Sequence, residues 1–215
     1  MSFAIDVISD VVCPWCYVGK RRLEAALAEL ADHDPGFGAL VNYHPFQLNP
    51  GLPYEGIDRR AHMEAKFGSG TRLAEIHARL NAVGESVGIA FEFDRITRQP
   101  NTLDAHRLIS WAQARADAGD VVERLFRAFF VEGRDVGDRA VLAAIAGEAG
   151  LDATAAHAFL DSGEGVDRIA AMDARARQLG VEGVPFFVFN EKIAVSGAHE
   201  PSVLIDAIAQ AREAA

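Results

Sequence analysis

Residues 3–30 read FAIDVISDVVCPWCYVGKRRLEAALAEL, and this stretch decides the fold. Its first part, residues 3–8, is apolar and rich in β-branched side chains, which predicts a short buried strand. From Pro14 onward, apolar side chains recur at steps of three and four residues, which predicts a helix. Pro14 suits the first helical turn, because the N–H that proline lacks has no helical partner there. Cys13 and Cys16 therefore lie where a strand passes into a helix.

The rest of the chain has a helical middle between two flanks with strand character. A second strand is predicted over residues 40–46, so the first flank is a β-α-β unit. The second flank is predicted to hold a hairpin over residues 186–195 and a last helix over 201–211. The middle has the periodicity of seven helices, over residues 58–67, 71–86, 102–116, 121–131, 138–149, 153–160 and 167–179. Side chains that suit helix N-caps are Thr71, Asn101, Asp138 and Asp152.

This order of elements predicts an α/β fold made of two domains. Residues 1–57 and 181–215 form a small mixed domain. Residues 58–180 form an all-helical domain inserted between its β-α-β and β-β-α halves. Glycine and proline cluster near residues 50–56 and 180–185, which is where the edges of the insertion are expected.

Composition and charge exclude several classes of protein. Of the 215 residues, 50% are hydrophobic and 24% are charged, which excludes wholesale disorder. The formal net charge is −10, from 31 acidic and 21 basic residues, so neither nucleic acid nor an anionic membrane is an expected partner. No run approaches the roughly 18 apolar residues of a membrane helix, and the first residues lack a basic leader. We therefore expect a soluble cytoplasmic protein.

The only two cysteines, Cys13 and Cys16, predict redox chemistry rather than a disulfide-stapled scaffold, which needs several bridges. At a helix N-terminus, the Cys13 sulfur is expected to face unpaired backbone N–H groups and the positive end of the helix dipole, which stabilise a thiolate. Cys16, one turn later, is expected to be less exposed and able to attack a mixed disulfide formed at Cys13. The spacing thus predicts a catalytic pair, with Cys13 as the nucleophile and Cys16 as the resolving thiol.

Two other interpretations of the cysteine pair remain open. Half of a zinc site would need two more ligands, and the nearest histidines, His33 and His44, lack paired spacing, so no metal is expected. Free cysteines are also common in protein cores. The proline at the helix start and the spacing of the pair favour thiol chemistry over an inert core.

A second motif, Gly183-Val184-Pro185, precedes the apolar residues 186–189. Proline is ordinary at the first residue of a strand, so on its own the motif indicates strand initiation. Only about 5–6% of X–Pro bonds in folded proteins are cis. The residues alone therefore do not identify a cis bond.

Taken together, these motifs closely resemble the DsbA-like thioredoxin-fold oxidoreductases, and most of all their FrnE branch. The resemblance covers about residues 3–210. It is carried by CPWCYVGK at 13–20, GVPFF at 183–187 and SGA at 196–198, and by the segments 100–108 and 130–133, which are similar to the FrnE branch. It extends to 2-hydroxychromene-2-carboxylate isomerases and kappa-class glutathione transferases.

The resemblance implies a thioredoxin fold with a helical domain inserted in it. It also implies that Pro185 is cis and lies beside the cysteines, and that the backbone of Val184 pairs with an extended substrate peptide. We therefore expect Pro14, Trp15, Val184 and Pro185 to bind substrate around the cysteines, with the insertion forming one wall of the groove. Because strongly oxidising DsbA proteins carry histidine in place of Trp15, a less oxidising pair is expected.

Three functions follow from these features. The leading one is a cytoplasmic reductase or isomerase of protein disulfides, which has no bound cofactor and draws electrons from an external thiol such as glutathione or from a thioredoxin system. Its partners are disulfide-containing proteins or thiols, and it is a monomer or a homodimer. The alternatives are a glutathione-dependent isomerase or transferase of a small aromatic or polyketide-type molecule, and a peptide-binding module without catalysis.

Four further side chains have two interpretations each. Lys20 is a surface lysine or a positive charge near the cysteines. Trp15 and Tyr17 form an apolar lip beside the sulfurs or pack elsewhere. His199 stands where the FrnE branch often has glutamine, and it is a solvated cap residue before Pro201 or a group that tunes the thiolate.

Overall fold

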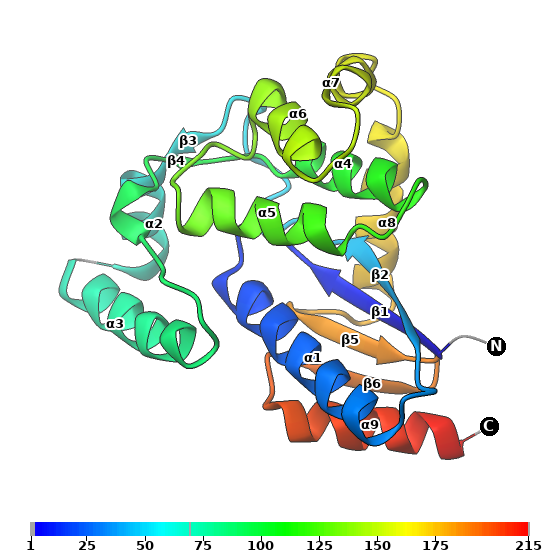
Figure 1. Ribbon diagram of the computed structural model, residues 1–215. Coiled ribbons are helices and arrows are strands. Elements are labelled where there is room, and N and C mark those ends of the chain that lie inside the picture. Colours follow the sequence, from blue (N-terminus) through cyan, green and yellow to red (C-terminus); the bar gives the residue numbers. More distant parts are fainter. Residues whose placement is uncertain (1–2, 69, 215) are drawn as a thin grey trace.

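The computed structural model describes residues 3–68 and 70–214. Its strands alternate with helices at both ends of the chain, and helices fill the middle (Figure 1). The strands are β1 Phe3–Ser9, β2 Ala39–Pro45, β3 Ile57–Asp58, β4 Arg98–Gln99, β5 Phe186–Phe189 and β6 Ile193–Ser196. The α-helices are α1 Pro14–His33, α2 Arg59–Phe67, α3 Gly70–Ser86, α4 Leu103–Gln113, α5 Gly119–Phe130, α6 Arg139–Glu148, α7 Ala153–Asp161, α8 Val166–Gln178 and α9 Pro201–Glu213, and a short 3-10 helix spans Phe93–Arg95.

A four-stranded sheet in the order β2-β1-β5-β6 joins the two ends of the chain. Strand β1 pairs in parallel with β2 and antiparallel with β5, and β5 pairs antiparallel with β6. The tight turn of this hairpin contains Asn190 and Glu191, whose φ angles of 51° and 60° match the hairpin turn that follows strand twist. This sheet confirms the predicted α/β fold and its β-α-β and β-β-α halves.

Successive side chains of β5 point to opposite faces of the sheet and pack into two different clusters. Phe187 and Phe189 are fully buried in the main core, together with residues of α1 and α9. Phe186 and Val188 point to the opposite face of the sheet, where they pack against a smaller cluster that includes Ala176 of α8. The last helix of the insertion therefore contributes to the core of the sheet domain.

The insertion is helical except for β4, which forms a two-residue antiparallel ladder with β3 at its edge. Its most amphipathic helix is α5, as the sequence predicts. Phe126, Phe129 and Phe130 of α5 are fully buried. Tyr17 of α1 stacks on Phe126, with ring centroids 5.0 Å apart. The apolar face of α5 thus joins the core of the insertion to that of the sheet domain.

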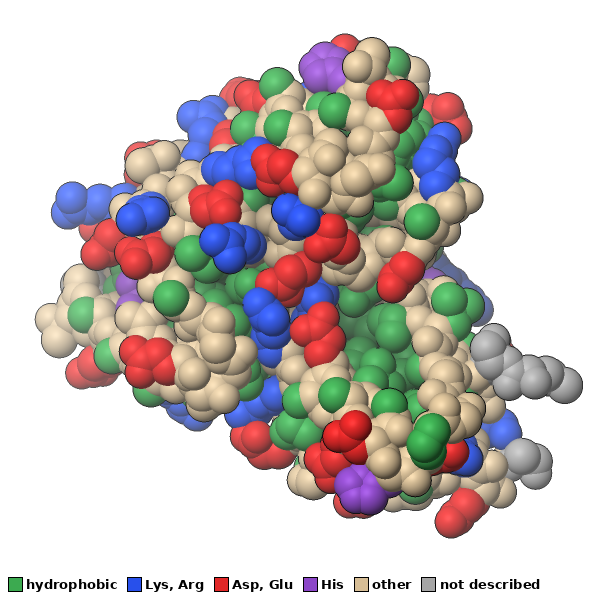
Figure 2. Space-filling model, viewed as in Figure 1, with side chains coloured by type: hydrophobic (Ala, Val, Ile, Leu, Met, Phe, Trp, Pro, Cys, Tyr) green, Lys and Arg blue, Asp and Glu red, His purple; other side chains and the backbone are tan. Residues whose placement is uncertain are grey.

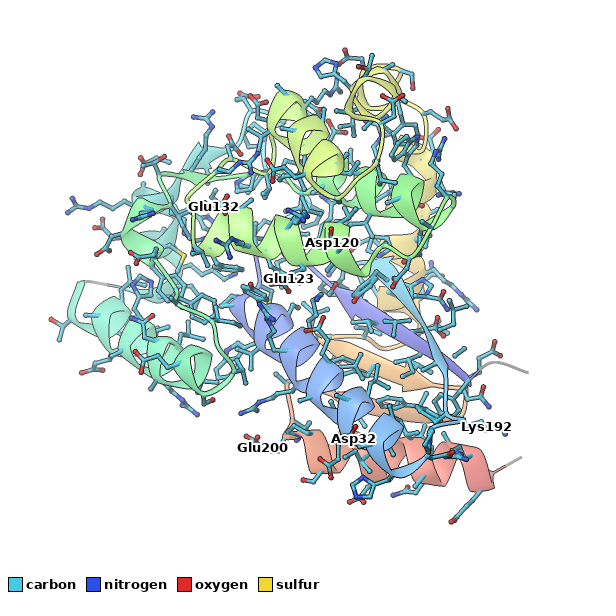
Figure 3. All side chains as sticks on the ribbon, in the orientation of Figure 1. Asp32, Asp120, Glu123, Glu132, Lys192 and Glu200 are labelled. Carbon is cyan, nitrogen blue, oxygen red and sulfur yellow. The ribbon has the colours of Figure 1, made fainter. Side chains whose placement is uncertain are left out.

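Helix α1 is also tied to α5 by a cluster of charges, and this corrects the interpretation of Lys20 as a surface lysine. Lys20 is buried, forms an ion pair with Glu24, and donates to Glu123 Oε2 at 3.0 Å. Arg21 donates to Glu123 Oε1 at 2.6 Å. Figure 3 shows Glu123 at the side of α5 that faces α1. Lys20 therefore neutralises Glu123 between two helices, because a buried charge needs an opposite charge beside it.

Of the four predicted N-caps, two are confirmed. The side chains of Asp138 and Asp152 accept backbone N–H bonds at the starts of α6 and α7. The N-cap of α4 is Thr102, while Asn101 Oδ1 accepts from the Leu103 N–H at 3.0 Å. Thr71 lies inside the first turn of α3, which begins at Gly70. Within the described residues, no helix has the length and apolar character needed to cross a membrane.

Candidate functional site

Cys13 is the N-cap residue of α1, and Pro14 is the first residue of the helix. The Cys13 side chain is 5% exposed and that of Cys16 is 2% exposed, so Cys16 is the less exposed of the two. Both are free thiols. The Cys13 sulfur lies at the start of the helix, as predicted for an N-cap position, and makes no capping hydrogen bond to its first N–H groups. Its thiol contacts the carbonyl oxygen of Val184, at 3.6 Å from the sulfur.

The loop that carries Val184 faces the cysteines, and its Val184–Pro185 peptide bond is cis. Within the described residues, neither the N–H nor the carbonyl of Val184 makes a backbone hydrogen bond. The chain resumes its pairing at Pro185, whose carbonyl accepts from the Gly197 N–H at 2.8 Å. Among the described residues, the Val184 backbone thus has no backbone partner, and its carbonyl oxygen lies beside the Cys13 sulfur.

Gly19 allows α1 to pack this closely against the loop, and the sequence analysis missed it. A Cβ atom at Gly19 would lie 2.9 Å from Pro185 Cγ and 3.1 Å from Phe187 Cζ. Any larger side chain would push the helix away from the proline. The only local signal was a glycine inside a predicted helix, which often has a packing reason.

A buried polar pair lies beneath the cysteines and was also missed. Asp10 is fully buried at the end of β1. Its Oδ2 accepts from the Leu48 N–H at 2.8 Å, and its Oδ1 lies 3.3 Å from Nε2 of the buried His106 in α4. The pair joins the loop before Cys13 to the helical insertion, so the insertion helps to position the site.

Burial raises the pKa of the Cys16 thiol well above its ordinary value of 9.0, and the neighbouring Cys13 sulfur acts in the same direction. The charge of Asp10 adds a smaller upward shift, while a hydrogen bond from the Asp10 backbone opposes it. Cys16 is therefore held as a neutral thiol in the resting reduced protein. This fits a resolving residue that acts only after a mixed disulfide has formed.

This raised pKa predicts an alkaline loss of stability. Above about pH 9 the Cys16 thiol ionises in the unfolded chain but stays protonated in the folded protein, so the folded state binds more protons and its stability falls as the pH rises. We expect the urea midpoint of the reduced protein to decrease between pH 8 and pH 10, and the decrease to be smaller in Cys16→Ser. Identical pH profiles for the two proteins would contradict the expectation.

A pocket of about 270 Å³ opens beside Cys13. One wall is the Cys13-Pro14-Trp15 segment with Leu48 and Asn49. The other is formed mainly by side chains of α2 and α3, with Phe93 of the 3-10 helix and Gln99 of β4. Trp15 thus lines the site as expected. Tyr17 does not, because its ring is buried against α5 and its hydroxyl donates to Glu123 at 2.7 Å.

The remaining sequence candidate, His199, is an exposed residue whose Nε2 lies 2.9 Å from the Ser196 carbonyl oxygen. The N-cap of α9 is the next residue, Glu200. The structure therefore brings together Cys13, Cys16, Pro14, Trp15, Val184 and Pro185. Within the described residues, no group of three or more His, Cys, Asp or Glu side chains is placed to hold a metal ion.

Comparisons with known proteins match nearly the whole chain. A family model described as a DSBA-like thioredoxin domain matches residues 4–209. The structure is similar to that of a probable DsbA oxidoreductase from Streptomyces coelicolor, with a TM-score of 0.86 and 33% identity over 98% of this chain and 90% of the other.

Two more distant proteins also match over nearly their whole length. The uncharacterized protein YwbO of Bacillus subtilis is 27% identical over 210 residues, which are 97% of this chain and 96% of that protein. The cytosolic disulfide reductase DsbM from Pseudomonas aeruginosa, solved with GSH, has a TM-score of 0.62 and 22% identity over 98% of this chain and 96% of its own. At that identity the likeness to DsbM extends to the fold alone.

Proposed function

Because this chain belongs to the family of DsbA-like thioredoxin domains, we propose that it is a thiol–disulfide oxidoreductase that reduces or isomerises protein disulfides through Cys13 and Cys16. The single observation that carries the proposal is the position of the Cys13 sulfur, 3.6 Å from the carbonyl of Val184. A substrate strand paired with the free backbone of Val184 would bring its own sulfur to Cys13.

The reaction consists of two exchanges. The Cys13 thiolate attacks one sulfur of the substrate disulfide, which forms a mixed disulfide and releases the other sulfur as a thiolate. Cys16 then loses its proton and attacks the Cys13 sulfur. This step forms the Cys13–Cys16 disulfide and releases the second substrate thiolate, so two electrons pass from the protein to the substrate. In isomerisation, a substrate thiol attacks the mixed disulfide in place of Cys16.

The cellular setting is part of the same proposal. A cytoplasmic location keeps the resting pair largely as a dithiol, which suits reduction and isomerisation. An external thiol such as glutathione, or a thioredoxin system, returns the electrons. The protein acts as a monomer or a homodimer on disulfide-containing proteins. Segments 100–108 and 130–133 support its placement in the FrnE branch.

Replacing Cys16 by serine tests the two-step reaction. Cys16→Ser removes the resolving thiol, so we expect insulin reduction to fall by about 100-fold or more, and a mixed disulfide with Cys13 to accumulate. Turbidity measures the first effect and intact-protein mass spectrometry the second. Recovery of ribonuclease activity from scrambled ribonuclease, with the wild-type protein, measures isomerisation in parallel.

The same variant separates this function from the glutathione-dependent alternative. An enzyme that activates glutathione for conjugation or isomerisation of a small molecule needs no resolving cysteine, and the pocket beside Cys13 offers room for such a molecule. Full activity of Cys16→Ser in a glutathione-dependent conversion, with no trapped mixed disulfide, would replace the proposed function by this alternative.

A further inference from the structure

The pocket beside Cys13 has an unusual charge. Its described lining includes two cationic side chains, Arg59 and Lys66, two histidines, His62 and His77, and no aspartate or glutamate. In the protein as a whole, acidic residues outnumber basic ones by 31 to 21. Figure 2 shows acidic and basic side chains interspersed over the visible face of the molecule. An acid-free pocket beside the nucleophile therefore departs from the rest of the surface.

Arg59 is the central charge of this pocket, and it is only 9% exposed. Among the described residues, no carboxylate oxygen lies within 4 Å of its guanidinium; its partners are the neutral Gln99 side chain, to which it donates, and the face of Phe129. The adjacent Asp58 carboxylate accepts from the Ala61 N–H instead. Burial lowers the pKa of Arg59 to about 10, so it remains charged at neutral pH. Buried charges normally have an opposite charge beside them.

A second side chain in the pocket lacks a partner. His77 Nε2 is buried and has no hydrogen-bond partner within the described residues, while its ring stacks on Phe93 at 4.2 Å between centroids. Burial and the charge of Arg59 lower the pKa of His77, so its imidazole is neutral at pH 7. Most of the remaining lining is apolar or aromatic and includes Met63 and Ile76, although Asn49 and Gln99 are polar. Within the described residues, the pocket thus combines a buried cation without an ion pair, Arg59, an exposed cation, Lys66, a free polar nitrogen and a largely apolar surface.

We propose that this pocket binds small disulfides that carry a carboxylate, with Arg59 holding the carboxylate while the disulfide lies at Cys13. These acidic, preferably aromatic, disulfides would be a substrate class in addition to proteins. The proposal rests on the thiol chemistry proposed above. The Cys13 thiolate forms a mixed disulfide with one half of the substrate and releases the other half as a thiolate. Cys16 then displaces the bound half and closes the Cys13–Cys16 disulfide, so the substrate gains two electrons.

A single-turnover experiment with prereduced protein tests the carboxylate site. The probes are dithiobis(nitrobenzoate), an aromatic disulfide with two carboxylates, and dithiodipyridine, which is aromatic and neutral at pH 7. For Arg59→Gln we expect the second-order rate with the anionic probe to fall about 10- to 100-fold, which is the range for a lost hydrogen bond to a charged group. The rate with the neutral probe should change less than about 3-fold.

Arg60→Gln is the matched control. Arg60 is the next residue on the same helix, is exposed, and pairs with Glu64 outside the pocket. Arg60→Gln therefore removes the same charge without touching the site. We expect both rates to change less than about 3-fold in Arg60→Gln, and Arg59→Lys to regain part of the rate with the anionic probe. Equal slowing of both probes in Arg59→Gln, or equal effects of the two variants, would overturn the proposal.

Binding of nitrobenzoate without any sulfur separates this proposal from the proposed function. Broadening of its NMR lines by wild-type protein, lost in Arg59→Gln and kept in Arg60→Gln, supports the carboxylate site even if no disulfide is turned over. In that case the proposed function is wrong but the carboxylate site at Arg59 is supported. No broadening by the wild-type protein overturns the site, even if insulin and dithiodipyridine are reduced.

Discussion

Replacing Cys13 by serine is expected to lower the rate of insulin reduction by about 1000-fold or more, because a serine hydroxyl stays protonated at neutral pH and cannot attack a disulfide. The change replaces only the sulfur atom of Cys13. The side chain of this N-cap residue makes no capping hydrogen bond to α1. The fold should therefore be unaffected. Turbidity measures the activity, and the thermal midpoint of the variant measures the fold.

Thiopyridone release and iodoacetamide modification test separately whether Cys13 is the nucleophile. Cys16→Ser keeps the nucleophile, so it should still release one equivalent of thiopyridone from dithiodipyridine, whereas Cys13→Ser should release none at a comparable rate. Iodoacetamide should modify Cys13 faster than the more deeply buried Cys16. If Cys13→Ser keeps a tenth of the wild-type activity, Cys13 is not the nucleophile. If Cys13 resists iodoacetamide, the binding-module alternative is favoured.

Replacing Arg107 by methionine is expected to lower the free energy of unfolding by about 3–5 kcal/mol, the usual range when one partner of a buried ion pair is removed. Arg107 is fully buried in α4. Its guanidinium donates to Asp104 and to the carbonyl oxygens of Phe159, Leu160 and Glu164. Methionine fills much of the space but removes the four hydrogen bonds that Arg107 donates. Asp104 keeps a bond from Arg139 and the Phe159 carbonyl keeps one from the Ser162 hydroxyl, so the loss falls mainly on the carbonyl oxygens of Leu160 and Glu164. Urea denaturation measures the change.

Two variants control for the loss of a charge. Arg107→Lys keeps the charge but not the planar fork of donors, so its stability should lie between those of the wild type and Arg107→Met. Arg127→Gln removes an exposed arginine that pairs with Glu132, and surface changes of this kind shift stability by about 0.5 kcal/mol or less. A loss below about 1 kcal/mol in Arg107→Met would show that the carbonyl oxygens find other donors.

The DsbA-like resemblance included Arg107 within segment 100–108, but the sequence did not say what this residue does. Helix α4 was predicted from its periodicity, because periodicity reflects which face of a helix is buried. That an arginine lies on the buried face, and that it holds the segment between α7 and α8, depends on carbonyl groups more than 50 residues away. Local patterns carry no information about such partners.

Lys20 is a second residue whose role depends on a partner far away in the sequence. Its sequence context permitted a surface lysine or a charge near the cysteines, and the structure buries it in ion pairs with Glu24 and Glu123. It is buried because α5 brings Glu123 against α1, from 103 residues along the chain. The sequence predicted α5 and its apolar stripe, but the residue that faces α1 depends on the angle at which the two helices pack.

The amino-acid sequence by itself determined the strand-to-helix junction with its cysteine pair, the helical middle and the hairpin near the end. These follow from interactions between residues a few positions apart, such as helical periodicity, strand alternation and the fixed backbone of proline. Tertiary structure alone decided that the Val184 carbonyl, 171 residues from Cys13, lies 3.6 Å from its sulfur. It also decided that Gly19 admits Pro185 and that Arg59 enters the pocket at Cys13. These contacts arise when separate elements pack together, and packing depends on the whole set of surfaces rather than on any one segment.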